Sequence, residues 1–194
     1  GKPQAIVPQA RLTAARRSLT PPCMTLRPIL IHPDPRLKKL CDSVEGVDDD
    51  LRRLIDDMLE TMYDAPGVGL AAPQIGVIRR VFVMDCAEKD ETPEPMALIN
   101  PEVVWSSEQE RVHEEGCLSI PDIYADVARP DRVRVRWLSR DGAECEGEFD
   151  GLAATCAQHE IDHLDGKLYI DYLSQLKRNR IRRKLEKQQR QESD

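Results

Sequence analysis

The stretch QHEIDHLDG, residues 158–166, limits the possible folds of this chain more than any other part of it. His159 and His163 are four residues apart, and on a helix this spacing turns both imidazole rings to one side. Glu160 follows the first histidine and completes the HExxH pattern of zinc hydrolases. Because catalytic zinc sites have three protein ligands, two histidines alone do not fix the metal. The fold must therefore bring a third ligand to this helix.

The sequence downstream of the pattern offers no good third ligand. One zinc-hydrolase class continues HExxHxxGxxH, and here Gly166 matches but Tyr169 occupies the place of the third histidine. Another class uses a downstream glutamate. The only glutamates after the motif are Glu186 and Glu192, which lie in a strongly charged tail and are poor candidates for a buried site.

The sequence upstream of the pattern leaves several candidates open. His32 stands beside a proline turn and His113 lies in a charged stretch. Among the cysteines, Cys117 is flanked by a glycine and a leucine where a strand is expected to end. Attention therefore moves to Cys117.

Length and cysteine usage favour a single catalytic domain in a reducing compartment. The 194 residues are enough for one hydrophobic core, with residues left for tails. No apolar run approaches the ~18 residues of a membrane span, so no membrane partner is expected. The cysteines form no CxxC pair, and we expect most of them to pack as small apolar side chains. They are Cys23, Cys41, Cys86, Cys117, Cys145 and Cys156.

Charge is distributed unevenly along the chain, whose net charge is −7. Residues 1–23 carry four basic and no acidic side chains, and residues 177–194 carry eight basic and three acidic ones. The segment between them holds twice as many acidic as basic residues. Because such a body repels phosphate backbones, any contact with nucleic acid falls to the tails.

The first 23 residues are rich in Pro, Ala and Arg and lack the apolar centre of a secretory signal. We expect this segment to lie outside the fold as a disordered extension. A transit peptide, a start artefact and an ordinary tail are the three interpretations, and Met24 favours the artefact. The expected organisation is an extension over 1–23, a catalytic domain over 24–175 and a basic helix or tail over 176–194.

Periodicity predicts an α+β fold. Apolar residues from Leu51 to Met62 have helical spacing behind an aspartate cluster, and Pro66 and Gly67 end this helix. A second helix is expected from about Asp150 and a third from about Leu173. Strands are expected over 77–85, 96–105, 133–138 and 143–149. We therefore predict antiparallel sheets packed around a central, metal-bearing HExxH helix, followed by a basic C-terminal helix.

Three motifs in order resemble the signatures of the peptide deformylase family. They are GVGLAAPQIG (67–76), EGCLS (115–119) and QHEIDHLDG (158–166). The similarity extends over most of 24–175. Any one motif alone would be weak evidence, but the three together are highly specific. The resemblance implies a metal-dependent hydrolase that removes the formyl group from N-terminal formylmethionine and releases formate.

The resemblance also implies roles for individual residues. The implied metal ligands are Cys117, His159 and His163. Glu160 would be the general base and then the acid that protonates the departing amine. The Gln74 side-chain amide and the Leu118 backbone N–H would stabilise the oxyanion. The fourth tetrahedral position of the metal is left for water.

The implied substrate-binding residues surround these motifs. They are Gly69, Val68, Gly116, Leu152, Thr155 and Cys156. The Gly69 backbone would bond to the extended peptide, and Glu115 with Gly116 would support the cysteine loop. For the apolar side chains, ordinary core packing is the competing interpretation. Tyr124 and the segment 121–130 are expected to line the groove.

The resemblance also implies a metal, binding partners and a cellular location for the protein. Thiolate and imidazole ligands suit Fe, Zn, Ni or Co, and the family favours Fe(II) first and Zn(II) second. The expected partner is the formylmethionyl N-terminus of nascent polypeptides, and the basic tail is expected to contact the ribosome. The expected location is the bacterial cytoplasm, or an organelle if residues 1–23 are a transit peptide. The alternatives are a non-catalytic N-terminus-binding relative and a Cys/His/His metallopeptidase.

Overall fold

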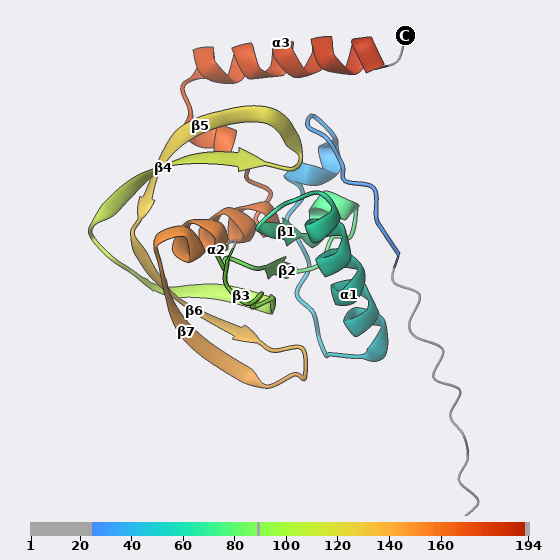
Figure 1. The fold of residues 1–194 in the computed structure, drawn as a ribbon, viewed down its shortest axis with the longest axis vertical. Coiled ribbons are helices and arrows are strands. Elements are labelled where there is room, and N and C mark those ends of the chain that lie inside the picture. Colours follow the sequence, from blue (N-terminus) through green and yellow to red (C-terminus); the bar gives the residue numbers. More distant parts are fainter. Residues whose placement is uncertain (1–24, 89, 193–194) are drawn as a thin grey trace, which may run out of the picture.

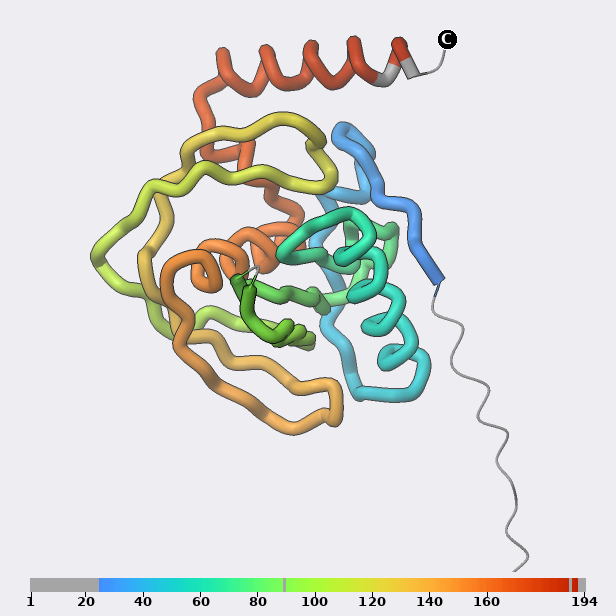
Figure 2. Tube along the Cα trace, viewed as in Figure 1, coloured from blue at the N-terminus to red at the C-terminus, as the bar shows by residue number. Residues whose placement is uncertain are grey.

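The computed structural model describes residues 25–88 and 90–192, which form helices around two antiparallel sheets (Figures 1 and 2). The helices are α1 (Asp49–Asp64), α2 (Gly151–Leu164) and α3 (Gln175–Glu192). The strands are β1 (Gly69–Ala71), β2 (Val81–Met84), β3 (Met96–Ser106), β4 (Glu110–Cys117), β5 (Ile120–Pro130), β6 (Arg132–Leu138) and β7 (Glu144–Asp150). Short 3-10 turns lie at Pro35–Lys38, Ala72–Ile75 and Tyr169–Tyr172.

The strands divide into a larger sheet and a hairpin. The five-stranded sheet has the order β1-β2-β3-β6-β7, and β4 pairs with β5 in the hairpin. Helix α2 lies between the two sheets and contacts β1, β2, β5, β6 and β7 (Figure 1). This arrangement matches the predicted α+β class, with the HExxH helix at the centre.

Helices α1 and α2 are defined by local features of the sequence. The Asp48 side chain accepts a hydrogen bond from the Leu51 N–H (2.8 Å) and caps α1, whose apolar side packs on β1 and β2. Beyond the end of α2, Gly166 has φ of 71°. A Cβ at that position would lie 2.6 Å from the Lys38 carbonyl oxygen, so the last glycine of QHEIDHLDG is required by close backbone approach.

The predicted elements differ from the structure at several strands. The expected strand 77–85 is regular only over β2, and β1 was not predicted. Strand β4 ends at Cys117, as expected, but β5 was not predicted as a strand. Its buried side includes Arg129, and a buried charge interrupts the apolar alternation that identifies a strand.

Two further expectations concern the ends of the chain. Helix α3 begins at Gln175, close to the expected start. The expectation for residues 1–23 falls outside the described residues. Within 25–88 and 90–192, no helix has both the length and the apolar character needed to cross a membrane.

Candidate metal centre

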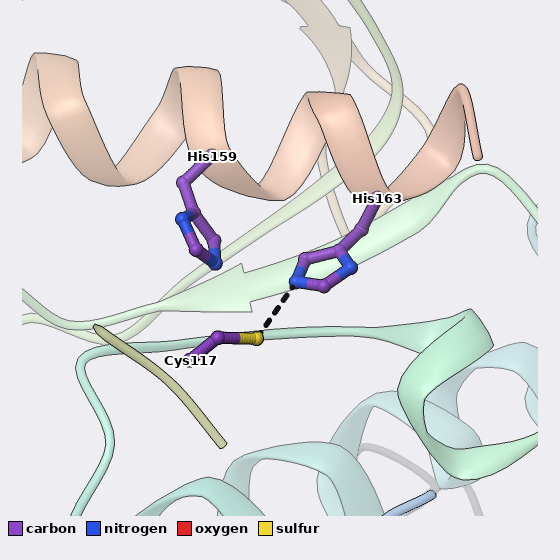
Figure 3. Close-up of side chains that lie close together, drawn as sticks. All are labelled: Cys117, His159 and His163. Atoms are coloured by element: carbon purple, nitrogen blue, oxygen red, sulfur yellow. Dashed lines mark hydrogen bonds between the residues drawn. The ribbon is translucent and has the colours of Figure 1, made fainter. Parts of the chain in front are cut away.

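Helix α2 and the end of β4 bring three possible metal ligands together. The side chains of His159 and His163 project from one side of α2 towards Cys117 (Figure 3). One ligand atom from each of the three residues lies within 4.8 Å of the others. Cys117 Sγ lies 3.3 Å from His163 Nε2. In the described part of the chain, this is the group of His, Cys, Asp or Glu side chains that can hold a metal ion.

The chemistry of the donor set fits a divalent transition metal. A tetrahedral ion with ordinary metal–sulfur and metal–nitrogen bonds places its ligand atoms roughly 3.3–3.6 Å apart, close to the separation of Cys117 and His163. Both histidines are buried. Burial, together with the neighbouring His159, holds the pKa of His163 well below its ordinary value, so its imidazole is neutral and able to bind a metal.

A buried hydrogen-bonded network orients His159. Its Nδ1 lies 2.9 Å from Glu115 Oε2. Arg129 donates from Nη2 to the same Glu115 oxygen (3.0 Å) and from Nη1 to Asp162 Oδ2 (2.7 Å). The Tyr172 hydroxyl also donates to Asp162, at 2.9 Å. Because Nδ1 is engaged by Glu115, the other ring nitrogen of His159 is directed towards Cys117 and His163.

Glu160 carries a buried oxygen with an unused capacity for hydrogen bonding. Its side chain is 4% exposed, and within the described residues Oε2 has no hydrogen-bond partner. Burial, its largest cause, raises the pKa of Glu160 to about 7. A Cβ added at Gly69 would lie 2.5 Å from Glu160 Oε1, so the absence of a side chain there leaves room beside the carboxylate.

Gln74 is held rigidly beside the cysteine. Its Oε1 accepts a hydrogen bond from the Ala71 N–H (2.9 Å). Its Nε2 donates to Ser119 Oγ (3.1 Å) and lies 3.6 Å from Cys117 Sγ. The side-chain amide therefore lies next to Cys117, a member of the metal-ligand cluster.

A pocket of about 510 Å³ opens onto this cluster. The predicted site residues that line it are Val68, Gly69, Gln74, Gly116, Cys117, Leu118, Leu152, Thr155, Cys156, His159 and Glu160. Leu152 is 43% exposed, so it is not a core residue, whereas Cys156 lies both in the core and in the pocket wall. Tyr124 and residues 121–123 line the pocket as expected, whereas residues 125–130 of the expected segment are not among its lining residues. Gly116 is packed under the Tyr124 ring, where a Cβ would come within 2.6 Å.

Sequence reasoning missed several residues around the centre. The roles of Ser119, Arg129, Asp162 and Tyr172 were not predicted. Ser119 accepts from Gln74, and the other three belong to the hydrogen-bonded network around Glu115. Asp162 lies within HEIDH, but nothing in its spacing distinguishes it from a surface aspartate. Glu115 was expected to support the cysteine loop, and its carboxylate contacts His159 and Arg129.

A Cys/His/His donor set with both histidines buried, together with a buried Glu160 oxygen that has no hydrogen-bond partner among the described residues, defines a metal-dependent hydrolase. A comparison with protein families identifies the family of hydrolases to which the chain belongs. The family model described as "Polypeptide deformylase" matches residues 26–179. The chain belongs to the peptide deformylase family, whose members are metal-dependent hydrolases that remove the formyl group from the N-terminus of nascent chains.

Individual relatives agree with this assignment over nearly their whole length. A peptide deformylase of Rhizobium meliloti is 56% identical over 164 residues, which are 84% of this chain and 94% of the relative. The crystal structure of peptide deformylase from Ehrlichia chaffeensis superposes with a TM-score of 0.85 at 38% identity, covering 88% of this chain and 100% of that one. A Met-Ala-Ser-bound peptide deformylase from Acinetobacter baumannii has a TM-score of 0.73 at 32% identity, covering 77% and 99%.

Proposed function

We propose that Cys117, His159 and His163 hold the metal for deformylation and that Glu160 carries the proton. The observation that supports this assignment is the buried Oε2 of Glu160, which has no hydrogen-bond partner in the described part of the chain and belongs to a residue that lines the same pocket as Cys117 and His159. A buried carboxylate oxygen without a partner is costly, so its position is best explained by a group that arrives during the reaction. When bound, the metal supplies a Lewis acid that activates water near neutral pH.

The proposed proton path uses Glu160 at both stages. Its carboxylate takes a proton from the attacking water while the water oxygen bonds to the formyl carbon. The same carboxyl group then delivers that proton to the methionine nitrogen as the carbon–nitrogen bond breaks. The products are formic acid and a peptide with a free N-terminal amine, which become formate and an ammonium group when the acid proton passes to the amine, so atoms and charge balance without another reactant.

Gln74 and Leu118 are proposed to stabilise the developing oxyanion. The support for Gln74 is its rigidity, because both ends of the amide are hydrogen-bonded before substrate arrives. Preorganised donors of this kind are typically worth about 3–4 kcal/mol of barrier. Leu118 follows the cysteine and lines the pocket, where its backbone N–H can serve the same purpose.

The pocket is proposed to take the methionine side chain and the following residues. Val68, Leu152, Thr155 and Cys156 supply a mainly apolar wall, and the missing side chain at Gly69 permits close approach of an extended peptide. The relative from Acinetobacter baumannii holds Met-Ala-Ser, which has the sequence of a deformylated N-terminus.

We propose Fe(II) as the metal, with Zn(II), Ni(II) and Co(II) as replacements, because one thiolate and two imidazoles suit each of them.

Helix α3 is proposed to dock on the ribosome in the cytoplasm. Leu185 is buried and packs with Ile181 and Leu173 against the apolar side chains of β5. The exposed basic residues of α3 are Lys177, Arg180, Arg182, Arg183, Lys184, Lys187 and Arg190. This charge suits the phosphate backbone of ribosomal RNA at the place where the substrate emerges.

Formate release from formyl-Met-Ala-Ser is the experiment that tests the proposed chemistry. The protein is purified without oxygen and loaded with Fe(II), Co(II) or Ni(II), and Glu160→Gln is prepared in the same way. We expect release by the wild type and loss by at least about 100-fold in the variant, the usual contribution of a positioned acid–base group. Metal analysis shows whether both proteins hold one ion.

The products separate the alternatives. A free amino acid or a peptide fragment in place of formate would indicate a metallopeptidase. Metal-loaded protein that binds the peptide and releases nothing would indicate a non-catalytic relative.

A further inference from the structure

Tyr169 occupies the position at which one class of zinc hydrolases has its third histidine, but its place in this fold is different. It lies in the 3-10 turn Tyr169–Tyr172 that follows α2, and it is 1% exposed. Its phenol ring is stacked on the imidazole of His159, with the ring centroids 6.0 Å apart and an angle of 23° between the ring planes. The residue therefore contacts a member of the metal-ligand cluster through the face of its ring.

The hydroxyl group of Tyr169 fixes the other end of the ring. It donates a hydrogen bond to the Ile123 carbonyl oxygen of β5, at 2.8 Å. Tyr169 and Ile123 belong to one buried apolar cluster, and Cys117 packs against the same cluster. A ring that is hydrogen-bonded at its end and closely packed on its sides has little freedom to move. It therefore presents a fixed flat surface to His159.

The stacking contact fixes a property of His159 that its hydrogen bond leaves free. The bond between Nδ1 and Glu115 sets the direction of the imidazole, but the torsion that rotates a histidine ring is broad, and one hydrogen bond permits the ring to tilt. The rings of Tyr169 and His159 are separated by a distance within the range of roughly 4.5–7 Å at which aromatic pairs attract. His163 meets His159 edge to face, at 4.9 Å between centroids. Packing against Tyr169 therefore restricts the tilt of the His159 ring.

We propose that Tyr169 is a positioning residue for the metal centre, which sets the plane of the His159 imidazole by stacking on it and so strengthens metal binding. The inference rests on the proposed function, in which His159 is a metal ligand. The requirement is for a flat ring, because the hydroxyl group is hydrogen-bonded to Ile123. Another aromatic side chain can therefore replace Tyr169, whereas an aliphatic side chain fills the space without restricting the imidazole.

The test uses the Co(II)-loaded enzyme, because the visible absorption of cobalt depends on the arrangement of its ligands. Wild type, Tyr169→Phe, Tyr169→Leu and Phe82→Leu are compared. The absorption spectrum, the competition for cobalt with a chelator and urea denaturation are measured for each. Phe82→Leu is the matched control, because Phe82 is a fully buried aromatic residue of β2 that belongs to another core cluster.

We expect the affinity of Tyr169→Leu for cobalt to fall at least about tenfold, the usual effect of removing a group that orients a metal ligand. Its absorption spectrum should also shift, because the imidazole is free to tilt. Tyr169→Phe should keep the spectrum and the affinity of the wild type, since the ring remains. Phe82→Leu should lose stability, as a large-to-small change in a core does, and keep both cobalt properties.

Two results would overturn the proposal. One is a Tyr169→Leu variant whose cobalt spectrum and affinity equal those of the wild type. The other is an equal change of spectrum and affinity in Phe82→Leu, which would show that loss of core packing is the cause. If Tyr169→Leu does not fold, Tyr169→Met is compared with Tyr169→Phe in the same way, because methionine is flexible and fills irregular space.

Failure of the proposed function has a different signature. A wild-type cobalt spectrum without a thiolate-to-metal band would overturn the assignment of the ligands, and the positioning role with it. A wild type that shows this band while Tyr169→Leu is unchanged would overturn the positioning role alone.

Discussion

Charged side chains are buried in ion pairs around Arg129, whereas on helix α3 most of them are exposed to solvent. Arg129 is 4% exposed, and its ion pairs with Glu115 and Asp162 are buried beside the metal-ligand cluster. Helix α3 is attached by the apolar side chains of Leu185 and Ile181, and most of its basic groups are exposed. Buried charges depend on every partner being present, whereas exposed charges are screened by water and salt. The first region is therefore rigid and costly to change, and the second can vary without loss of the fold.

Removing Arg129 is expected to have the largest effect. In Arg129→Met the carboxylates of Glu115 and Asp162 remain buried without their cation, so the free energy of unfolding falls by about 3–5 kcal/mol. Urea denaturation measures the loss. Arg136→Met is the control, because its ion pair with Glu146 is exposed and contributes less than about 1 kcal/mol. Equal losses in both variants would contradict the contrast between buried and exposed charge.

Glu115→Gln is expected to weaken metal binding more than stability. The amide cannot replace the carboxylate that holds His159 in orientation, and metal affinity is expected to fall about 10- to 100-fold. Competition with a chelator measures the affinity of each protein. Glu114→Gln changes the neighbouring exposed carboxylate and is expected to leave that affinity unaltered. A similar decrease in both would show that net charge, and not the contact with His159, sets metal affinity.

Gly166→Ala tests a backbone constraint that involves no charged side chain. The new Cβ would meet the Lys38 carbonyl at 2.6 Å, on a backbone with positive φ, so we expect a loss of about 1–3 kcal/mol. Gly46→Ala is the matched control, because nothing lies within 4 Å of its Cβ. The midpoint temperature of thermal unfolding should be clearly lower for Gly166→Ala than for Gly46→Ala. Equal midpoints would contradict the requirement for glycine at position 166.

Neutralising α3 is expected to have the smallest effect on the fold. Arg182→Gln combined with Arg183→Gln removes two exposed charges and should change stability by less than about 0.5 kcal/mol. Binding to ribosomes should weaken and become less dependent on salt. Co-sedimentation at two salt concentrations measures both properties. The pair Arg132→Gln and Arg134→Gln on β6 removes the same charge elsewhere, and equal weakening by it would show that docking is not specific to α3.

Sequence alone was sufficient where the determinants are local. The spacing of His159 and His163 placed both imidazoles on one side of a helix, and the aspartates before Leu51 marked the start of α1. Three motifs, each a short continuous stretch of sequence, identified the family. In the structure, the site residues predicted from these motifs lie in the metal-ligand cluster or line its pocket. Each of these signals lies within about a dozen residues, where chain geometry leaves few alternatives.

Only the tertiary structure decided the contacts between distant residues. Nothing in the sequence distinguishes Arg129 from the other arginines, and only the position of β5 brings it into contact with Glu115 and Asp162. Because Arg129 is a charged residue on the buried side of β5, the sequence pattern did not predict this strand. Cys156 and Val68 are 88 positions apart, and the thiol lies 3.6 Å from the Val68 carbonyl because α2 packs beside β1. The position of a local motif follows from backbone geometry, but the partner of a buried charge or thiol follows from how the sheets and α2 pack, which spacing along the chain does not encode.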